Sequence, residues 1–238
     1  MKAQKLLLVL LIIVGMNTAR AQDKVEADLT VDFVSSYIWR GMDLGGAALQ
    51  PELSVGWKSL SLSASGNAGI TDNLRELDLT LSYTIGGFSL SVVDYWSDTE
   101  GKRYFDYKPE STEHSFEGAI EYDFGPVKAS WQTIFAGSDY QETDEKRAFS
   151  SYLEISAPFR LGSLEWEATV GMVPWASDYY ETEGFSLNCL SLMASKDIQI
   201  TEKFSLPFYA KLIANPTSRK FYFVAGFTLK VFGTDKNE

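Results

Sequence analysis

The chain has 238 residues and a formal net charge of −11, with 32 acidic against 21 basic residues. This excess of negative charge argues against nucleic acid as a partner, because phosphate backbones attract basic surfaces. Cys189 is the only cysteine, so no internal disulfide can form and the fold must depend on strand pairing and packing.

The first residues have the organisation of an export signal. Lys2 and Lys5 precede an apolar run at 6–14, and Ala19-Arg20-Ala21 forms a cleavage site, so we expect residues 1–21 to be removed. The apolar run is too short to span a bilayer, and no cysteine follows the site to carry lipid. Cleavage would leave a net charge of about −14. We expect residues 22–238 to form one domain, since no linker or low-complexity tract divides them.

The stretch 27–40, ADLTVDFVSSYIWR, alternates apolar and polar residues. This period of two predicts one extended strand with an apolar face and a polar face. The run is about twice the usual strand length, and its apolar face ends in Tyr37 and Trp39. An aromatic pair at that position is typical of a lipid-facing strand near a membrane interface.

Strands with similar patterning follow along the rest of the chain. A bulge is predicted at Val93-Asp94, and the register of 185–195 is left open. No apolar run approaches the ~20 residues that a transmembrane helix requires. The predicted strands after the first are 49–57, 60–68, 76–85, 88–96, 115–124, 127–135, 148–159, 164–172, 184–196, 205–214 and 220–232.

Short and long connections alternate between these strands. Lys58-Ser59 and Gly86-Gly87 make tight turns, whereas 97–113 and 137–146 are long and polar. An even number of about twelve strands with this asymmetry predicts an all-β fold, a transmembrane antiparallel up-and-down β-barrel with both termini on the periplasmic side. A soluble secreted β protein is the alternative class.

The last strand has an apolar face suited to closing a barrel. Closure is required because an unpaired strand edge is energetically costly in lipid. Its end resembles the C-terminal signal that the barrel-assembly machinery recognises in outer-membrane proteins. The residues concerned are Gly226, Leu229, Val231 and Phe232, and the chain continues past them with GTDKNE.

The segment Ser36-Tyr37-Ile38-Trp39-Arg40-Gly41 resembles the opening motif of the TorF-like porin family, bacterial conserved hypothetical outer-membrane proteins of the Gcw_chp type. The motif residues are Ser36, Tyr37, Trp39, Arg40 and Gly41. The resemblance covers residues 28–57 and resumes at Asn215-Pro216 and the last strand. It implies an outer-membrane barrel of porin type and supplies no catalytic residue set.

The inward face of the predicted strands carries more carboxylates than cations. For Arg40 we expect an ion pair with Asp28, Asp32 or a carboxylate of a neighbouring strand, as a structural bridge or at a pore constriction. Carboxylate rings favour cations, so an open lumen would prefer cations weakly, whereas a plugged, hydrogen-bonded interior is the alternative. The predicted lumen residues are Asp28, Asp32, Glu52, Glu76, Asp78, Glu117, Glu121, Asp123, Glu154, Glu165 and Glu167 against Arg40, Lys128, Lys211 and Lys230.

Three other features have simpler interpretations. His114 and Ser115 are adjacent on a strand and so point to opposite faces, which argues against a proton-sharing catalytic pair. The acidic loops 94–100 and 139–145 lack the spacing of a calcium loop and are interpreted as solvated, with bridging to lipopolysaccharide through divalent ions as the alternative. The remaining tryptophans are expected on the outer wall; they are Trp57, Trp96, Trp131, Trp166 and Trp175.

These observations favour a narrow outer-membrane channel for small solutes, embedded in outer-membrane lipid and lipopolysaccharide, with no cofactor or metal and no catalytic residues. The first alternative is a non-conducting structural or adhesion barrel that acts through its outer loops. A carbohydrate-binding soluble β-sandwich and a barrel hydrolase are further alternatives.

Overall fold

The computed structural model describes residues 24–98, 102–108, 111–141, 146–202 and 204–233. The expected signal at 1–21 lies outside these residues. No helix among them is long and apolar enough to cross a membrane. The strands are β1 (Val25–Val34), β2 (Tyr37–Trp39), β3 (Met42–Gly45), β4 (Ala48–Trp57), β5 (Leu60–Gly69), β6 (Arg75–Ile85), β7 (Phe88–Ser97), β8 (His114–Asp123), β9 (Lys128–Gly137), β10 (Ser151–Leu161), β11 (Leu164–Val173), β12 (Ser186–Thr201), β13 (Phe204–Asn215) and β14 (Lys220–Phe232).

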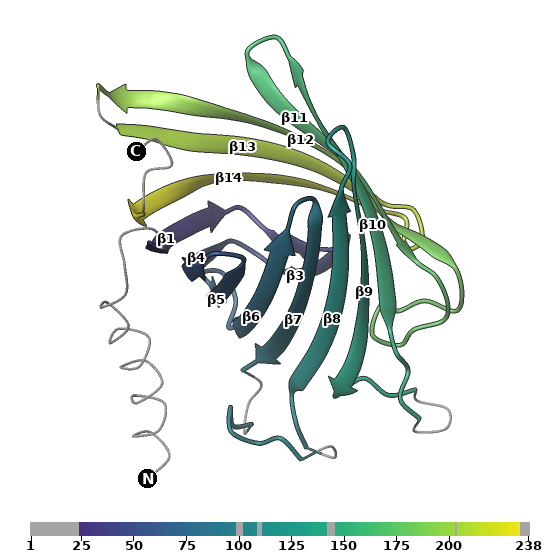
Figure 1. Ribbon diagram of the computed structural model, residues 1–238. Helices are drawn as coiled ribbons and strands as arrows, with labels where there is room; N and C mark the ends of the chain where they lie inside the picture. Colours follow the sequence, from purple (N-terminus) through teal and green to yellow (C-terminus); the bar gives the residue numbers. More distant parts are fainter. Residues whose placement is uncertain (1–23, 99–101, 109–110, 142–145, 203, 234–238) are drawn as a thin grey trace.

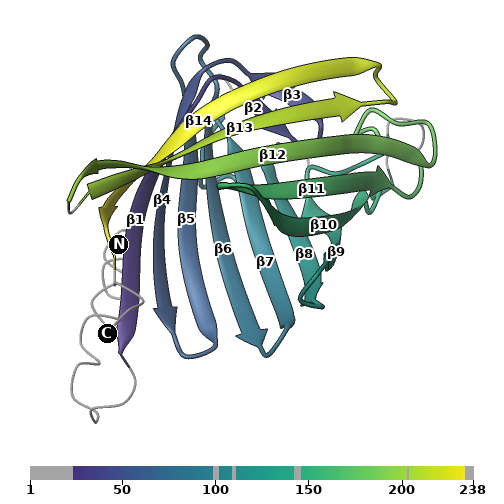
Figure 2. The ribbon, with the colours of Figure 1, turned by 90° about the horizontal axis from the view of Figure 1, so that it is seen from above.

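Twelve of these strands close into one antiparallel barrel, and β2 and β3 form a separate two-stranded sheet (Figures 1 and 2). Each barrel strand pairs with its neighbours in the sequence, and β1 closes the ring by pairing with both β4 and β14. The predicted fold class, an up-and-down barrel of about twelve strands, is confirmed.

The alternation of apolar and polar side chains explains the two different faces of the barrel wall. Along β6, Leu81 and Ile85 are 54% and 58% exposed on the outer face, while Asp78 and Thr80 between the outward positions face inward. Exposed large apolar side chains recur on every barrel strand, an arrangement that water-exposed walls avoid and lipid-exposed walls require. Members of this outer band include Leu53, Leu62, Leu81, Val92, Ile120, Trp131, Ile155, Val170, Leu192, Leu212, Phe223 and Val231.

The two ends of the barrel differ in their connections. Tight turns join β4 to β5, β6 to β7, β8 to β9 and β10 to β11 at one end, where β1 begins and β14 ends. Gly86 and Gly162 have φ of +58° and +64° in two of these turns, a conformation that glycine adopts without strain. At the other end, β7 ends and β8 begins, as do β9 and β10 and β11 and β12; these are the pairs of strands with the longer connections, as the alternation of lengths predicts.

The predicted single strand 27–40 is wrong beyond Val34. The chain leaves the wall at Ser35, β2 pairs with β3, and Arg40 and Gly41 make the turn between them with φ of +50° and +80°. The alternation continues across the break, but Tyr37 and Trp39 contact barrel residues from the inside instead of facing lipid. The polar and aromatic partners of Tyr37 and Trp39 lie in the lumen, which explains why this segment turns inward from the wall.

Two further expectations concern register. The predicted bulge at Val93-Asp94 is absent, because β7 pairs without a shift with both β6 and β8. Strand β12 is longer than the predicted strand 184–196 and continues to Thr201. In the segment left open, Cys189 is buried and Leu190 is exposed on the outer wall.

Candidate functional site

The segment 37–45, comprising β2 and β3, forms a hairpin that enters the lumen; we call it the inserted hairpin. Its base is fixed by Asp72, whose carboxylate accepts from the Gly46 amide at 2.7 Å. Its tip is fixed by Asn215, whose Nδ2 donates to the Gly41 carbonyl at 3.1 Å. A Cβ at Gly41 would lie 1.9 Å from the Asn188 carbonyl oxygen, so only glycine permits this approach to the wall.

Arg40 joins the hairpin to the far wall through Glu117 of β8. Its Nη1 and Nη2 donate to the two Glu117 oxygens at 2.6 and 2.8 Å, a bidentate pair with side-chain exposures of only 11% and 2%. The Tyr95 hydroxyl donates to Glu117 at 3.0 Å, and the Tyr180 hydroxyl accepts from Arg40. We call the Arg40–Glu117 pair the anchor. Breaking one side would leave a buried, uncompensated charge.

Aromatic rings surround the anchor. The Arg40 guanidinium lies 4.3 Å from the Trp39 ring centroid and 4.8 Å from that of Tyr152, both within cation–π distance. Trp39 also packs against Tyr95, Tyr179 and Tyr180. Burial raises the pKa of Tyr180, in the β11–β12 connection, to about 12, so this hydroxyl stays protonated at neutral pH.

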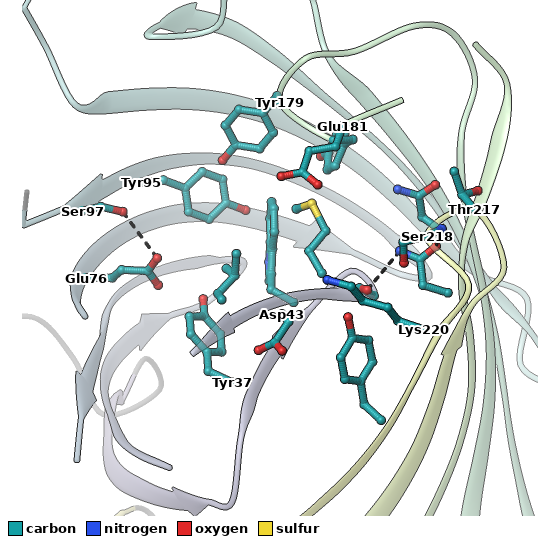
Figure 3. Close-up of a pocket in the computed structure, with 18 of the residues that line it drawn as sticks. Tyr37, Asp43, Glu76, Tyr95, Ser97, Tyr179, Glu181, Thr217, Ser218 and Lys220 are labelled. Atoms are coloured by element: carbon teal, nitrogen blue, oxygen red, sulfur yellow. Dashed lines mark hydrogen bonds between the residues drawn. The ribbon is translucent and has the colours of Figure 1, made fainter. Parts of the chain in front are cut away.

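A cavity of about 410 Å³ lies beside the hairpin, at the end of the barrel with the long connections; we call it the outer cavity (Figure 3). Its walls come from the hairpin, β6, β7, the β11–β12 connection and the β13–β14 turn. The carboxylates that line it are Asp43, Glu76, Asp78 and Glu181, against a single cation, Lys220. Ser97 donates to Glu76 at 3.4 Å.

A second cavity, of about 200 Å³, lies deeper against β1, β4, β5 and β6; we call it the inner cavity. Asp32, Gln50 and Glu52 line it. Tyr37 and Asp78 line both cavities, so they stand where the two spaces adjoin. In the described part of the lumen, acidic side chains therefore line two adjoining cavities beside the inserted hairpin.

Several predicted lumen residues gather around these features. Asp32 and Glu52 line the inner cavity, and Glu76 and Asp78 line the outer cavity. The Lys230 ammonium lies 3.8 Å from Asp28. Another group lies around Glu154 of β10, which is within electrostatic range of Arg40; the other members are Glu121, Glu167 and Lys211.

Other predictions need correction. Arg40 pairs with Glu117 on β8, and neither Asp28 nor Asp32 is its partner, because the hairpin carries it away from β1 across the lumen. Two exposed pairs lie at the rim of the barrel beside the short turns. They are Asp123–Lys128 at 3.6 Å and Glu165–Arg160 at 2.5 Å.

Apart from Trp39, the aromatic residues around the anchor were not predicted from the sequence. Tyr179 and Tyr180 lie between the predicted strands 164–172 and 184–196, and Tyr152 was not singled out within the predicted strand 148–159. The one available signal is the motif end Trp39-Arg40-Gly41, because an arginine followed by glycine is unusual within a lipid-facing strand.

His114 lies on the outer face of the wall, not in the lumen. Directly paired residues share a face, so Asp94 and His114 project outward with Leu79 and Phe116. His114 Nδ1 lies 2.6 Å from the Asp94 carboxylate, and Nε2 donates to the Tyr104 carbonyl at 2.5 Å. Ser115 projects to the opposite face and bonds Ser138, so the two adjacent residues form no pair.

Segment 102–108, which we call the aromatic strap, covers His114 completely. The Tyr107 ring stacks on His114 at 4.4 Å and the Tyr104 ring packs edge-on at 5.0 Å, leaving His114 with no exposed surface. Trp96, expected on the outer wall, lies under Tyr104 at 5.3 Å. The strap thereby separates an outward-facing carboxylate, Asp94, from the surroundings of the wall.

The remaining predictions have the following outcomes. Trp57, Trp131 and Trp175 are exposed on the outside, and Trp166 stacks on Phe159. Asp139 of the second acidic loop is buried and accepts from Ser150, whereas 142–145 lie outside the described residues. No group of three or more potential metal ligands occurs in the part of the chain that the structure describes.

The proposed assembly signal lies at the closing seam. Leu229 pairs with Val31 and Phe232 with Leu29, while a Cβ at Gly226 would meet the Tyr209 ring at 2.6 Å. Val231 and Phe232 are exposed on the wall. Recognition by assembly machinery stays a prediction.

No family model matches the chain, so the resemblance to the TorF-like porins also stays a prediction. No curated protein matches it either. Among solved structures, the NanC porin is 9% identical with a TM-score of 0.44, covering 85% of this chain and 97% of its own. An outer-membrane channel from Pseudomonas putida F1 is 10% identical with a TM-score of 0.42, covering 90% and 97%. Salmonella typhi OmpF is 9% identical with a TM-score of 0.37, covering 87% and 97%. Likenesses this weak assign neither a family nor an activity.

Proposed function

We propose that this protein is an outer-membrane β-barrel of porin type that conducts small solutes through a narrow lumen with a weak preference for cations. The observation that carries the proposal is the contrast between the two faces of one closed wall. Its outer face is an apolar band, and its inner face carries carboxylates around two adjoining cavities.

The outer face supports a membrane location. Closure leaves no unpaired strand edge, which lipid requires, and the exposed apolar side chains would be unfavourable in water. The export signal expected at 1–21 and the resemblance at Ser36–Gly41 favour the outer membrane of a diderm bacterium. The barrel would then contact outer-membrane lipid and lipopolysaccharide, after insertion by the barrel-assembly machinery.

The charges in the lumen support the proposed preference for cations. Asp78 lies where the cavities adjoin, and Arg40, the one basic residue of the inserted hairpin, is neutralised by Glu117. An ion passing Tyr37 would therefore pass more carboxylates than basic side chains, which favours cations.

One observation favours the non-conducting alternative. The inserted hairpin occupies part of the lumen and is fixed at both ends, by Asp72 at its base and by the anchor at its tip. A barrel plugged in this way would act through its outer connections instead.

The two functions are distinguished in a planar bilayer under a KCl gradient. We first verify the folded barrel by a band that shifts on boiling in gel electrophoresis. Discrete current steps with a reversal potential on the cation side support the proposal. Equal anion and cation permeability removes the cation preference, and a shifting band without current supports the non-conducting barrel.

A further inference from the structure

We propose that the outer cavity is a binding site for a small organic cation, an ammonium or guanidinium group attached to an apolar or aromatic body. This inference rests on the proposed function, since it names the class of solute that the lumen would take. A cavity of about 410 Å³ lies within the range of small-ligand sites.

The charge of the cavity selects a cation. Asp43, Glu76, Asp78 and Glu181 face one lysine, Lys220, across it. None of these four carboxylates forms an ion pair with a lysine or arginine among the residues that the structure describes. Carboxylates grouped at the mouth of a protein lumen repel one another and favour a positive ligand between them.

The aromatic lining selects an organic cation over a hydrated metal ion. Tyr37, Trp39, Tyr95, Tyr179 and Tyr222 contribute rings to the same cavity, and Figure 3 shows three of the tyrosines around the carboxylates. Aromatic faces attract alkylammonium and guanidinium groups, which shed water more easily than small inorganic ions do.

The protein already uses this chemistry next to the cavity. The Arg40 guanidinium lies over Trp39, a ring that also lines the outer cavity, and is held by a carboxylate and a tyrosine hydroxyl. The anchor is thus an occupied aromatic–carboxylate cation site within the same lumen. The outer cavity repeats its elements, with Glu76 and Tyr95 supplied by neighbouring wall strands, and no lysine or arginine of the described residues forms an ion pair with Glu76.

The test is calorimetric titration of the whole folded protein in detergent at low salt with benzyltrimethylammonium. Benzyl alcohol and benzenesulfonate serve as neutral and anionic probes of similar shape. We expect the cation to bind, and the other two probes to bind at least tenfold more weakly. Equal binding of benzyl alcohol, or no binding of the cation to protein that shows the heat-modifiable band, would overturn the inference.

Variants locate the site. We expect the double variant Glu76→Gln/Asp78→Asn to weaken cation binding at least tenfold, and Tyr222→Leu to weaken it several-fold by removing one aromatic face. Glu165→Gln, at the opposite rim, is the matched control and should bind as the natural protein does. Unchanged binding by the folded double variant would overturn the inference.

Failure of this inference is separable from failure of the proposed function. Cation-selective current without benzyltrimethylammonium binding overturns the binding site and leaves the channel. Binding without current supports the site and removes the channel.

Discussion

Strand β8 carries two buried polar side chains, Glu117 and His114, on opposite faces of the wall. Glu117 faces the lumen and is covered by the inserted hairpin through Arg40, whereas His114 faces outward with Asp94 and is covered by the aromatic strap. Both pairs are short, at 2.6 Å, and each ties a connection to the wall. The difference is where each connection lies: the inserted hairpin lies inside the lumen, and the aromatic strap lies on the outer face of the wall.

The largest expected effect comes from breaking the inner pair on one side. Glu117→Gln would leave the Arg40 charge buried without its bidentate partner, and losing one member of such a pair costs about 3–5 kcal/mol. Urea unfolding in lipid vesicles should show this loss. The double variant Arg40→Ala/Glu117→Ala removes both charges, so it should be more stable than the single variant. If Glu117→Gln is as stable as the natural protein, the anchor contributes nothing to the stability of the barrel.

Breaking the outer pair should have a smaller effect. His114→Ala would leave Asp94 on the outer face without its main partner and release the Tyr104 carbonyl, at a cost of about 1–3 kcal/mol for the unsatisfied groups. We expect faster proteolysis within the strap and an unchanged single-channel conductance. A change in conductance would contradict the separation of the two faces. Trp131→Phe, elsewhere on the outer wall, is the control for general effects of wall substitutions.

The smallest expected effect is at the rim. Arg160 and Glu165 form a short ion pair, but both side chains are about two-thirds exposed or more. Solvent screening reduces such pairs to roughly 0–1 kcal/mol. Arg160→Ala should therefore unfold at nearly the same urea concentration as the natural protein. A loss of stability as large as that of Glu117→Gln would show that burial does not determine how much each ion pair contributes.

The barrel wall could be predicted from the sequence because the alternation of apolar and polar residues within each strand shows which face is apolar. The alternation of Leu77, Leu79 and Leu81 with Asp78 and Thr80 determines which side faces outward, without reference to any distant residue. Twelve such segments joined by alternating short and long connections leave closure as the consistent solution.

The inserted hairpin and the strap could not be predicted in the same way. Tyr37 and Trp39 continue the alternation of β1, so a lumen-facing hairpin has the same local pattern as a lipid-facing strand. The distinction depends on Glu117, 77 residues away from Arg40 in sequence. Asp94 interrupts an apolar face, and this was interpreted as a bulge, whereas the structure keeps the register and covers the carboxylate with Tyr104 and Tyr107.

The central claim is that the anchor holds the hairpin where it narrows the path past Tyr37 and Asp78. The most direct test is the single-channel conductance of Arg40→Ala/Glu117→Ala beside that of the natural protein, in the same bilayers and after the same heat-modifiability check. Release of the hairpin predicts larger or more variable current steps from the double variant. Identical current steps from a correctly folded double variant would contradict the claim.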